Sequence, residues 1–247
     1  MYKRVLLKLS GESLGGPEGK GLDPESLRKY SKEIARAAKA GLQILSLIHI
    51  SEAGLQIAIV NGGGNIFRGL QGLEKGFDRV EGDRMGMLAT VINSLALSQF
   101  IKDEGVHAEV FSATPMEPLV RYYNRDNAVK VLEEGGVALI AGGTGSPFFT
   151  TDSGAALRAL EINADVVLKG TRVDGVYTAD PEKDPTAVKY DELTFDEAMA
   201  RHLKVLDQTA YALCSDGNMP IIVFDVNVEG NLLKLVNGGK VGTLVHR

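Results

Sequence analysis

Two lysines stand in apolar segments of the chain, where a charged side chain is costly unless it meets an anion. Lys8 falls within the run from Val5 to Leu9, and Lys169 ends the run that starts at Asp165. Each lies beside a turn that contains glycine. Two such point charges suit the phosphates of a nucleotide and the charge of a phosphoryl group in transfer. For either lysine alone, a surface position on an edge strand is the alternative.

Three predicted strands run directly into polar or glycine-rich turns. These turns are Lys8-Leu9-Ser10-Gly11, Gly62-Gly63-Gly64-Asn65 and Gly142-Gly143-Thr144-Gly145. In parallel sheets, ligands bind at the carboxyl ends of the strands. One glycine turn alone is weak evidence, but three at the same edge predict a single phosphate-binding rim.

The segment from Gly143 to Ser153 combines backbone N–H groups, threonine hydroxyls and one carboxylate ahead of a predicted helix. Helix N-termini bind anions. Asp152 has two interpretations that the sequence leaves open. It caps the helix, or its carboxylate orients the two lysines or helps to hold magnesium.

The segment from Thr171 to Pro181 predicts a turn, a short hairpin and a second turn, with Asp174-Gly175 as the clearest turn signal. Tyr177 lies between the polar turns, where its ring is placed to cover an adenine. Ordinary loop packing is the alternative for this tyrosine.

Several well-known catalytic motifs are absent from the sequence. No Walker P-loop, Rossmann glycine fingerprint, protein-kinase set or nucleophile elbow occurs. A single cysteine, Cys214, excludes an internal disulfide framework and a cysteine-based zinc site. The four histidines are scattered, so no protein-built metal site is expected.

Composition is that of an ordinary globular chain. The 247 residues are 44% hydrophobic and 24% charged, with a net charge of −5 and no tryptophan. The acidic balance and the few aromatic residues argue against a nucleic-acid partner. No charge-free apolar run reaches the roughly 18 residues of a membrane span, and the N-terminus does not resemble a signal peptide. We therefore expect a cytoplasmic protein without a membrane partner.

Apolar runs alternate with helical patterns along the whole chain. The expected strands are residues 5–9, 57–60, 108–111, 137–140, 165–169, 221–224 and 243–245, the last closing the sheet. The expected helices are residues 24–40, 84–102, 124–134, 152–163, 195–204, 208–216 and 230–237, with Asp23 capping the first. This alternation predicts an α/β fold in which helices cover both faces of a mostly parallel sheet.

One segment breaks the pattern. Residues 40–44 recur at residues 53–57, and deleting thirteen residues would join the first long helix cleanly to the second strand. We interpret residues 45–57 as a duplicated insert, for which a cloning or sequencing artefact is one origin. A genuine longer strand or hairpin is the alternative.

Together these motifs resemble the amino acid kinase superfamily, and within it the bacterial branch that phosphorylates UMP. The resemblance runs from Tyr2 to the C-terminus apart from the insert, and the motif from Thr144 to Asp152 is specific to that branch. It rests on residues 8–12, 62–69, 82–87, 143–153 and 173–181. Asn61 stands where an apolar residue is usual, a departure that we expect to be tolerated.

The resemblance implies a three-layer α/β/α sandwich, a single domain over residues 1–247. Residues 1–165 would then bind the acceptor and residues 166–247 would bind ATP. The enzyme would be a nucleoside monophosphate kinase that transfers a phosphoryl group from ATP with Mg²⁺ to UMP, giving ADP and UDP in pyrimidine biosynthesis. The metal would be held mainly through phosphates. Lys8 and Lys169 would neutralise the moving phosphoryl group, Asp152 would align them, and no general base would be needed.

The resemblance also implies binding residues. Those on the ATP side are Lys8, Leu9, Ser10, Gly11, Gly64, Arg68, Thr171, Tyr177 and Asp180. Those on the UMP side are Gly63, Asp83, Thr144, Gly145, Ser146, Pro147, Phe148, Phe149, Thr150 and Thr151. The segment Glu18, Gly19, Lys20, Gly21, Leu22 and Asp23 resembles a region linked to activation by GTP.

A homohexamer with GTP as activator and UTP as inhibitor is implied as well. Two other functions remain open at this level. A member of the same superfamily could phosphorylate a carboxylate or carbamate instead of UMP. A regulatory nucleotide-binding module without turnover, or a partner in transcriptional control, is the alternative from a different class.

Overall fold

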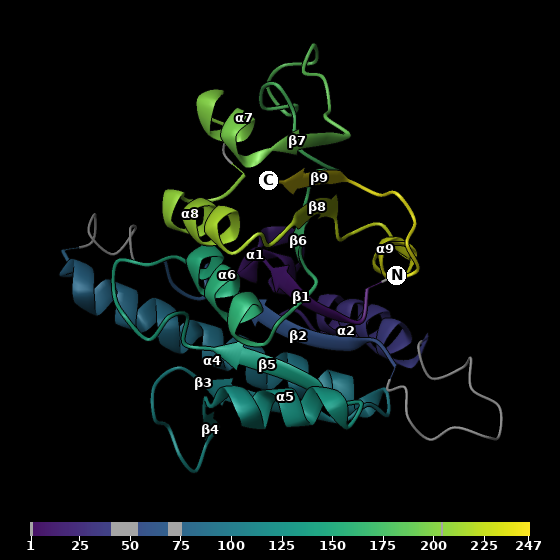
Figure 1. Cartoon of the computed structure of the whole chain (residues 1–247). Helices are drawn as coiled ribbons and strands as arrows, with labels where there is room; N and C mark the ends of the chain where they lie inside the picture. Colours follow the sequence, from purple (N-terminus) through teal and green to yellow (C-terminus); the bar gives the residue numbers. More distant parts are fainter. Residues whose placement is uncertain (1, 41–53, 69–75, 204) are drawn as a thin grey trace, which may run out of the picture.

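The structure is a computed structural model that describes residues 2–40, 54–68, 76–203 and 205–247. Within these residues a nine-stranded sheet has the order β4-β3-β5-β2-β1-β6-β8-β9-β7 (Figure 1). The strands are β1 (Arg4–Leu9), β2 (Gln56–Asn61), β3 (Ala108–Ser112), β4 (Arg121–Tyr122), β5 (Val137–Ala141), β6 (Val166–Thr171), β7 (Glu192–Thr194), β8 (Ile221–Asp225) and β9 (Thr243–His246). All pairs are parallel except β8 with β9.

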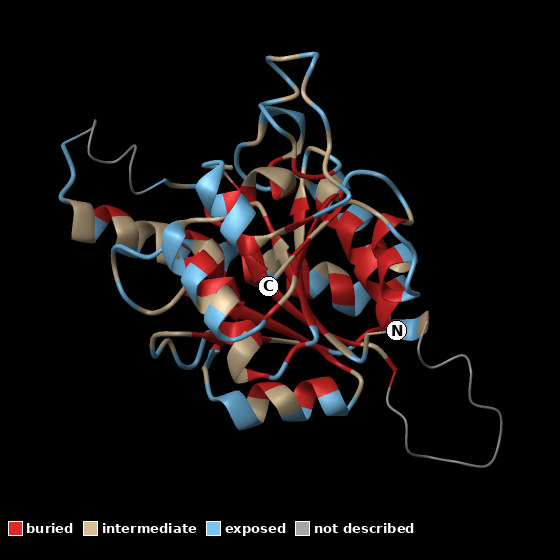
Figure 2. Cartoon of the chain, turned by 45° about the horizontal axis from the view of Figure 1, so that its top comes forward, coloured by how far each residue is buried: buried red, intermediate tan, exposed pale blue. Residues whose placement is uncertain are grey.

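Helices cover both faces of this sheet and form a three-layer sandwich. They are α1 (Gly11–Leu14), α2 (Pro24–Ala40), α4 (Arg79–Asp103), α5 (Arg125–Glu133), α6 (Thr151–Glu161), α7 (Phe195–Ala200), α8 (Gln208–Asp216) and α9 (Asn231–Val236), with a 3₁₀ turn η1 (Gly16–Glu18). One apolar core joins the sheet to α2, α4 and α9, and the other joins it to α5, α6, α7 and α8. Figure 2 shows the buried strands in the middle and the exposed sides of the helices outside.

Alternate residues of a strand point to opposite faces of the sheet. This alternation determines the face to which the side chains of Lys8 and Lys169 point. In β1, Leu7 belongs to the core with α2 and α4, whereas Leu6 belongs to the core with α6 and α8. Lys8 is two residues from Leu6, and Lys169 is two residues from Val167, which lies in that same core. Both lysines therefore face α6 and α8.

The α/β fold class and the mostly parallel sheet are confirmed, with differences at several ends. Helix α4 begins at Arg79 rather than residue 84, because Asp78 Oδ1 caps it by accepting from the N–H of Val80 at 2.9 Å. Helix α7 ends at Ala200, and His202 has a φ of 53°, which stops the predicted helix short of residue 204.

The sequence analysis did not predict the shortest strands and the shortest helix. Strands β4 and β7 and helix α1 are only two to four residues long, too short for a hydrophobic period to show. The expectation that residues 243–245 close the sheet was wrong, because β7 pairs with the outer side of β9.

The suspected insert at residues 45–57 lies partly outside the described residues, which resume at residue 54. From there the chain enters β2, which is paired along its length with β1 and also with β5. The strand that leads to the glycine turn at residues 62–64 is thus fully formed. Among the described residues, no helix is both long and apolar enough to cross a bilayer.

Candidate active site

A carboxylate bridges the two lysines at the carboxyl edge of the sheet. Lys8 and Lys169 are register partners on the neighbouring parallel strands β1 and β6. Lys8 Nζ lies 2.9 Å from Asp152 Oδ1, and Lys169 Nζ lies 2.6 Å from Asp152 Oδ2. The three side chains are 13%, 14% and 16% exposed, for Lys8, Lys169 and Asp152 respectively. The predicted convergence of the lysines is confirmed, and we call these three residues the catalytic cluster, after the role that we propose for them below.

Burial and the neighbouring charges shift the pKa values of this cluster in opposite directions. Burial alone would raise the pKa of Asp152, but the adjacent ammonium groups of Lys8 and Lys169 lower it to about 2. Burial lowers the pKa of Lys169, and the carboxylate of Asp152 partly offsets that effect. Lys169 also donates to the carbonyl of Val205, so its ammonium group is held from two sides.

Asp152 is free for the lysines because another residue caps its helix. The N-cap of α6 is Thr150, whose hydroxyl accepts from the N–H of Asp152 at 3.0 Å and of Ser153 at 3.4 Å. The interpretation of Asp152 as the cap was therefore wrong. The carboxylate lies in the first turn, where the helix dipole also favours negative charge.

The three glycine turns lie side by side, as the strand order β5-β2-β1 requires. The N–H of Gly62 donates to the carbonyl of Leu9 at 2.9 Å. A Cβ on Gly11 would meet the carbonyl oxygen of Gly62 at 2.7 Å, so a side chain there would force the two turns apart. Gly142 and Gly143 have φ of 77° and 59°, which favours glycine at both positions. The three turns thus share one edge of the sheet, as predicted, and their binding of phosphate stays a prediction.

A cavity of about 300 Å³ opens between this rim and α4. We call it the acceptor cavity. Seven of the ten residues expected on the UMP side line it, namely Gly63, Asp83, Thr144, Ser146, Phe149, Thr150 and Thr151. The other three do not: a Cβ on Gly145 would face Ala113, while Pro147 and Phe148 lie outside the lining, Phe148 with 67% of its surface exposed.

Six residues that line the acceptor cavity were not among the expected binding residues. They are Phe67, Arg79, Gly86, Met87, Thr90 and Gly143. Thr90 accepts from the N–H of Gly142 at 2.8 Å, which fixes the third glycine turn against α4. Phe67, Gly86, Met87 and Gly143 lie inside the motif segments 62–69, 82–87 and 143–153, whereas Arg79 and Thr90 only flank the segment 82–87.

A larger cavity of about 600 Å³ is lined by Lys169 and by residues of the segment from Thr171 to Lys183. We call it the donor cavity. Thr171, Tyr177 and Asp180 all line it, as expected for the ATP side. The phenol of Tyr177 donates to Asp174 at 2.5 Å.

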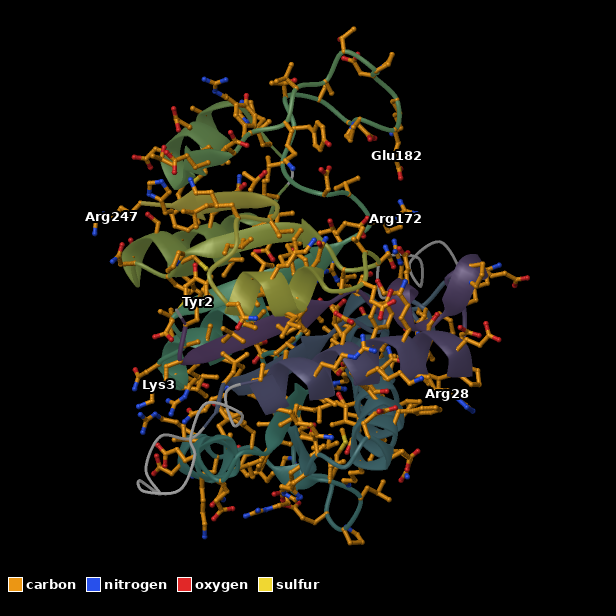
Figure 3. All side chains as sticks on the ribbon, turned by 90° about the vertical axis from the view of Figure 1, so that its right-hand side faces the viewer. Tyr2, Lys3, Arg28, Arg172, Glu182 and Arg247 are labelled. Carbon is orange, nitrogen blue, oxygen red and sulfur yellow. The ribbon has the colours of Figure 1, made fainter. Side chains whose placement is uncertain are left out.

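The hairpin predicted within residues 171–181 is not formed. Tyr177 instead makes an antiparallel bridge with Lys189, farther along the chain. The loop between them reaches over the sheet edge, where Glu182 lies above Arg172 at an ion-pair distance of 3.5 Å (Figure 3).

A third cavity, of about 580 Å³, holds part of the segment expected to respond to GTP. Glu18, Gly19 and Lys20 line it, whereas residues 21–23 do not. Gly64 and Arg68 lie on both this cavity and the acceptor cavity. Arg68 forms an ion pair with Glu12 here.

Leu9, an expected ATP-side residue, and Asn61, the departure from the family pattern, are both buried in the structure. Leu9 is buried in the core of the sheet, so only its backbone is available to a ligand. Asn61 is buried too, and its side chain hydrogen-bonds with that of Ser94 on α4 at 3.2 Å. That bond explains how a polar residue fits where an apolar one is usual.

Within the described residues, no group of three or more His, Cys, Asp or Glu could hold a metal ion. The buried carboxylate of the catalytic cluster is already shared by two ammonium groups. Cations and glycine N–H groups form the rim, and this chemistry fits a metal that arrives bound to nucleotide phosphates.

The sequence matches the amino acid kinase family over residues 3–225. A uridylate kinase of Parabacteroides distasonis is 56% identical over 245 residues, covering 99% of this chain and 98% of that protein. One of Bacteroides thetaiotaomicron is 54% identical with the same coverage. Among solved structures, the UMP kinase of Bacillus anthracis has a TM-score of 0.91 at 36% identity, covering 99% of this chain and 96% of that one. The UMP kinase of Ureaplasma parvum has a TM-score of 0.89 at 34% identity, covering both chains fully.

Proposed function

This chain belongs to the amino acid kinase family and is a nucleoside monophosphate kinase that phosphorylates UMP, and we propose that its catalytic cluster carries out the transfer. The single observation that supports this mechanism best is the carboxylate of Asp152 shared between Lys8 and Lys169. It holds two positive charges together; Lys169 lines the donor cavity, and Thr150 and Thr151, next to Asp152 in the chain, line the acceptor cavity.

In the proposed reaction, a phosphate oxygen of UMP attacks the γ-phosphorus of ATP. A new P–O bond forms, the bond to the β–γ bridging oxygen breaks, and the electron pair leaves with ADP. A phosphomonoester has a second pKa of about 6, so the attacking phosphate is largely dianionic at neutral pH. Catalysis then needs no general base and consists of positioning and charge neutralisation.

Each cavity would bind one of the two nucleotides. The donor cavity would hold adenine and ribose through Thr171, Tyr177 and Asp180, with the triphosphate reaching the rim at Ser10 and Gly11. The acceptor cavity would hold UMP, with its phosphate toward Gly63 and its nucleoside toward Asp83. The chain would thus split near residue 165 into an acceptor-binding and an ATP-binding part.

Kinases of this family use ATP with a divalent metal, and we propose Mg²⁺. When bound to the phosphates, the metal supplies additional charge neutralisation. The chain's own contribution is to hold two ammonium groups and the glycine N–H groups around the same phosphates.

We also propose that the chain assembles into a homohexamer in the cytoplasm, activated by GTP and inhibited by UTP. Exposed Leu88, Ile92 and Leu95 are spaced along one side of α4, as in a helix that packs against a second copy. Lys20 and its neighbours on the third cavity would take part in the response to GTP.

An ADP-release assay across four acceptors tests the substrate. UMP should give the highest kcat/KM, ahead of CMP and dUMP, and acetylglutamate should give no turnover. Preferred turnover of acetylglutamate would point to a carboxylate kinase of the same superfamily. Nucleotide binding without ADP release from any acceptor would point to a regulatory module.

A further inference from the structure

Helix α4 carries three buried polar residues on the side that packs against the sheet. Thr90, Asn93 and Ser94 are 2%, 0% and 1% exposed. Residues three and four positions apart lie on one face of a helix, so the three side chains share that face. Burial of a polar side chain is costly unless it is hydrogen-bonded. Thr90 and Asn93 have their partners in the glycine turns at the rim.

Asn93 is joined to the second glycine turn through a reciprocal pair of amides. Asn93 Nδ2 donates to Asn65 Oδ1 at 2.7 Å, and Asn65 Nδ2 donates to Asn93 Oδ1 at 2.9 Å. Asn93 Nδ2 also donates to the carbonyl of Gly62 at 2.7 Å, and Asn65 Nδ2 to the carbonyl of Gly21 at 2.6 Å. All the N–H groups of the two amides are thus used, and a buried network that is fully satisfied is rigid.

The hydrogen bond from Asn93 to Gly62 also sets the direction of the next N–H group. The carbonyl of Gly62 and the N–H of Gly63 belong to one planar trans peptide unit, so they point in opposite directions. Because the carbonyl is held toward the amide of Asn93, the N–H of Gly63 is held away from it.

Thr90 holds the third glycine turn from a position one helical turn earlier. Its hydroxyl accepts from the N–H of Gly142 at 2.8 Å and donates to the carbonyl of Met87 at 2.7 Å on its own helix. The donated hydrogen bond fixes the rotation of the hydroxyl, so that its lone pair stays on Gly142. The second and third turns are consequently attached to a single helix.

Four N–H groups of these two turns have no acceptor within the described part of the chain. They belong to Gly63, Gly64, Gly143 and Thr144. All four residues line the acceptor cavity. Successive backbone N–H groups in a turn form concave sites that bind anions such as phosphate. The value of these sites depends on the direction of each N–H, which the contacts with α4 control.

We propose that Asn93 and Thr90 are positioning residues for the phosphoryl transfer: by fixing the peptide planes of the second and third glycine turns, they direct the N–H groups of those turns at the phosphates. The inference rests on the proposed function, because it takes phosphates to bind at the rim. Asn93 has no exposed surface and acts only through the turn. Donors that are fixed before the reaction need no reorganisation in the transition state.

Substitutions that keep the size of the side chain test these contacts. Thr90→Val keeps the shape and removes the hydroxyl, whereas Thr90→Ser keeps the hydroxyl and removes a methyl group. Asn93→Leu removes the amide. Ser98→Ala is the matched control, because Ser98 is 2% exposed on the same helix. Its hydroxyl donates at 3.5 Å to the carbonyl of Ala108, at the start of β3 and so at the opposite edge of the sheet from the rim.

Thr90→Val should lower kcat with UMP about 10-fold, because a small displacement of groups around the reacting atoms is costly. Asn93→Leu should lower kcat at least as much. Thr90→Ser should stay within about 2-fold of the parent, since it keeps the hydroxyl, and Ser98→Ala should match the parent.

The midpoint of thermal unfolding, measured for every variant, separates positioning from stabilisation. Loss of a buried hydrogen bond should lower this midpoint in Thr90→Val and in Ser98→Ala alike. A residue that only stabilised the fold would lower the midpoint and leave the kcat of the folded enzyme unchanged well below it. Positioning predicts a loss of kcat in Thr90→Val at temperatures where the variant is fully folded.

A folded Thr90→Val enzyme with the parent's kcat would contradict the inference. A Thr90→Ser enzyme as slow as Thr90→Val, or a Ser98→Ala enzyme that loses kcat to the same extent, would contradict it as well. If Asn93→Leu does not fold, the other three variants still decide the question. A parent that releases no ADP with UMP would overturn the proposed function, whereas an active parent with unchanged variants would overturn this inference alone.

Discussion

The catalytic cluster and a second group, formed by Arg79, Asp83 and Phe148 beside the acceptor cavity, use the same arrangement in different surroundings. We call the second group the latch. In each, one aspartate contacts two groups that carry N–H bonds, by an ion pair or a hydrogen bond, and in each it lies in the first turns of a helix. In the cluster all three side chains are at most 16% exposed, whereas in the latch Arg79 is 30% exposed and Phe148 lies largely in solvent.

From this difference in burial we predict that the cluster governs the rate and that the latch governs the binding of UMP. Electrostatic interactions strengthen as water is excluded, and the pKa of Asp152 is lowered to about 2 by its two lysines despite burial. The latch has one ion pair, one backbone hydrogen bond and one stacked ring, whereas the carboxylate of the cluster has two ion pairs. Changes in the cluster should therefore reduce kcat, and changes around the mouths of the cavities should raise KM.

The largest expected effect is the loss of either lysine. Lys8→Ala and Lys169→Ala should each lower kcat about 100- to 1000-fold, as removal of one preorganised donor from a charged transition state does. Steady-state kinetics at saturating ATP and UMP measures this effect. Near-normal turnover by either folded variant would remove that lysine from the mechanism.

A matched control shows that the effect depends on the site rather than on losing a lysine. Lys130 lies on α5, is largely exposed and faces Glu134 at 3.9 Å. Since such surface pairs contribute little, Lys130→Ala should keep the parent's kcat within about 2-fold.

Asp152→Asn should have the next largest effect. The amide preserves the shape of the side chain but leaves two ammonium groups close together without a shared counter-charge. We expect kcat to fall roughly 10- to 100-fold, because the lysines repel each other and no longer converge on one phosphoryl group. A variant with unchanged kcat would limit Asp152 to a structural role.

Acid stability measures the same carboxylate without an activity assay. The folded pKa of Asp152 is lowered from 3.8 to about 2, so its ion pairs stabilise the fold above about pH 4, and that stabilisation is lost as pH falls toward 2. The shift corresponds to about 2 kcal/mol of unfolding free energy. Denaturant unfolding from pH 6 to pH 2 should show this loss in the parent, and the loss should shrink in Asp152→Asn. Equal pH dependence in both proteins would contradict the charge balance described for the cluster.

The smallest expected effect lies at the exposed wall of the donor cavity. Tyr177→Ala should raise KM for ATP about 2- to 10-fold through the loss of ring stacking, with kcat and the KM for UMP little changed. Tyr177→Phe keeps the ring and should remain close to the parent. If Tyr177→Ala instead lowered kcat as strongly as a lysine variant, the division between buried cluster and exposed cavity would fail.

The features that could be predicted from the sequence are those of the buried strands and of their ends. Lys8 and Lys169 were predictable, because a charged residue in an apolar strand stands out and the strand period fixes the face to which it points. The glycine turns were also predictable, because their position follows from the ends of the strands. Asp152 could be placed near the lysines, but its role could not be separated from capping until Thr150 was seen to occupy the cap.

Contacts between loops and distant elements could not be predicted. Arg79 lies at the start of a helix that was expected to begin five residues later, and its partner Phe148 is 69 residues away in the chain. The pairing of Tyr177 with Lys189 likewise depends on where a long loop returns. Neither contact has a local period or a turn signal, so only the folded arrangement reveals it.

The most direct test of the account is a crystal structure with ADP, UMP and aluminium fluoride, which mimics the phosphoryl group in transfer. The account predicts that the Nζ atoms of Lys8 and Lys169 both lie about 3 Å from the fluoride group, with Asp152 still between them. A structure in which either ammonium group faces away from the fluoride would contradict it.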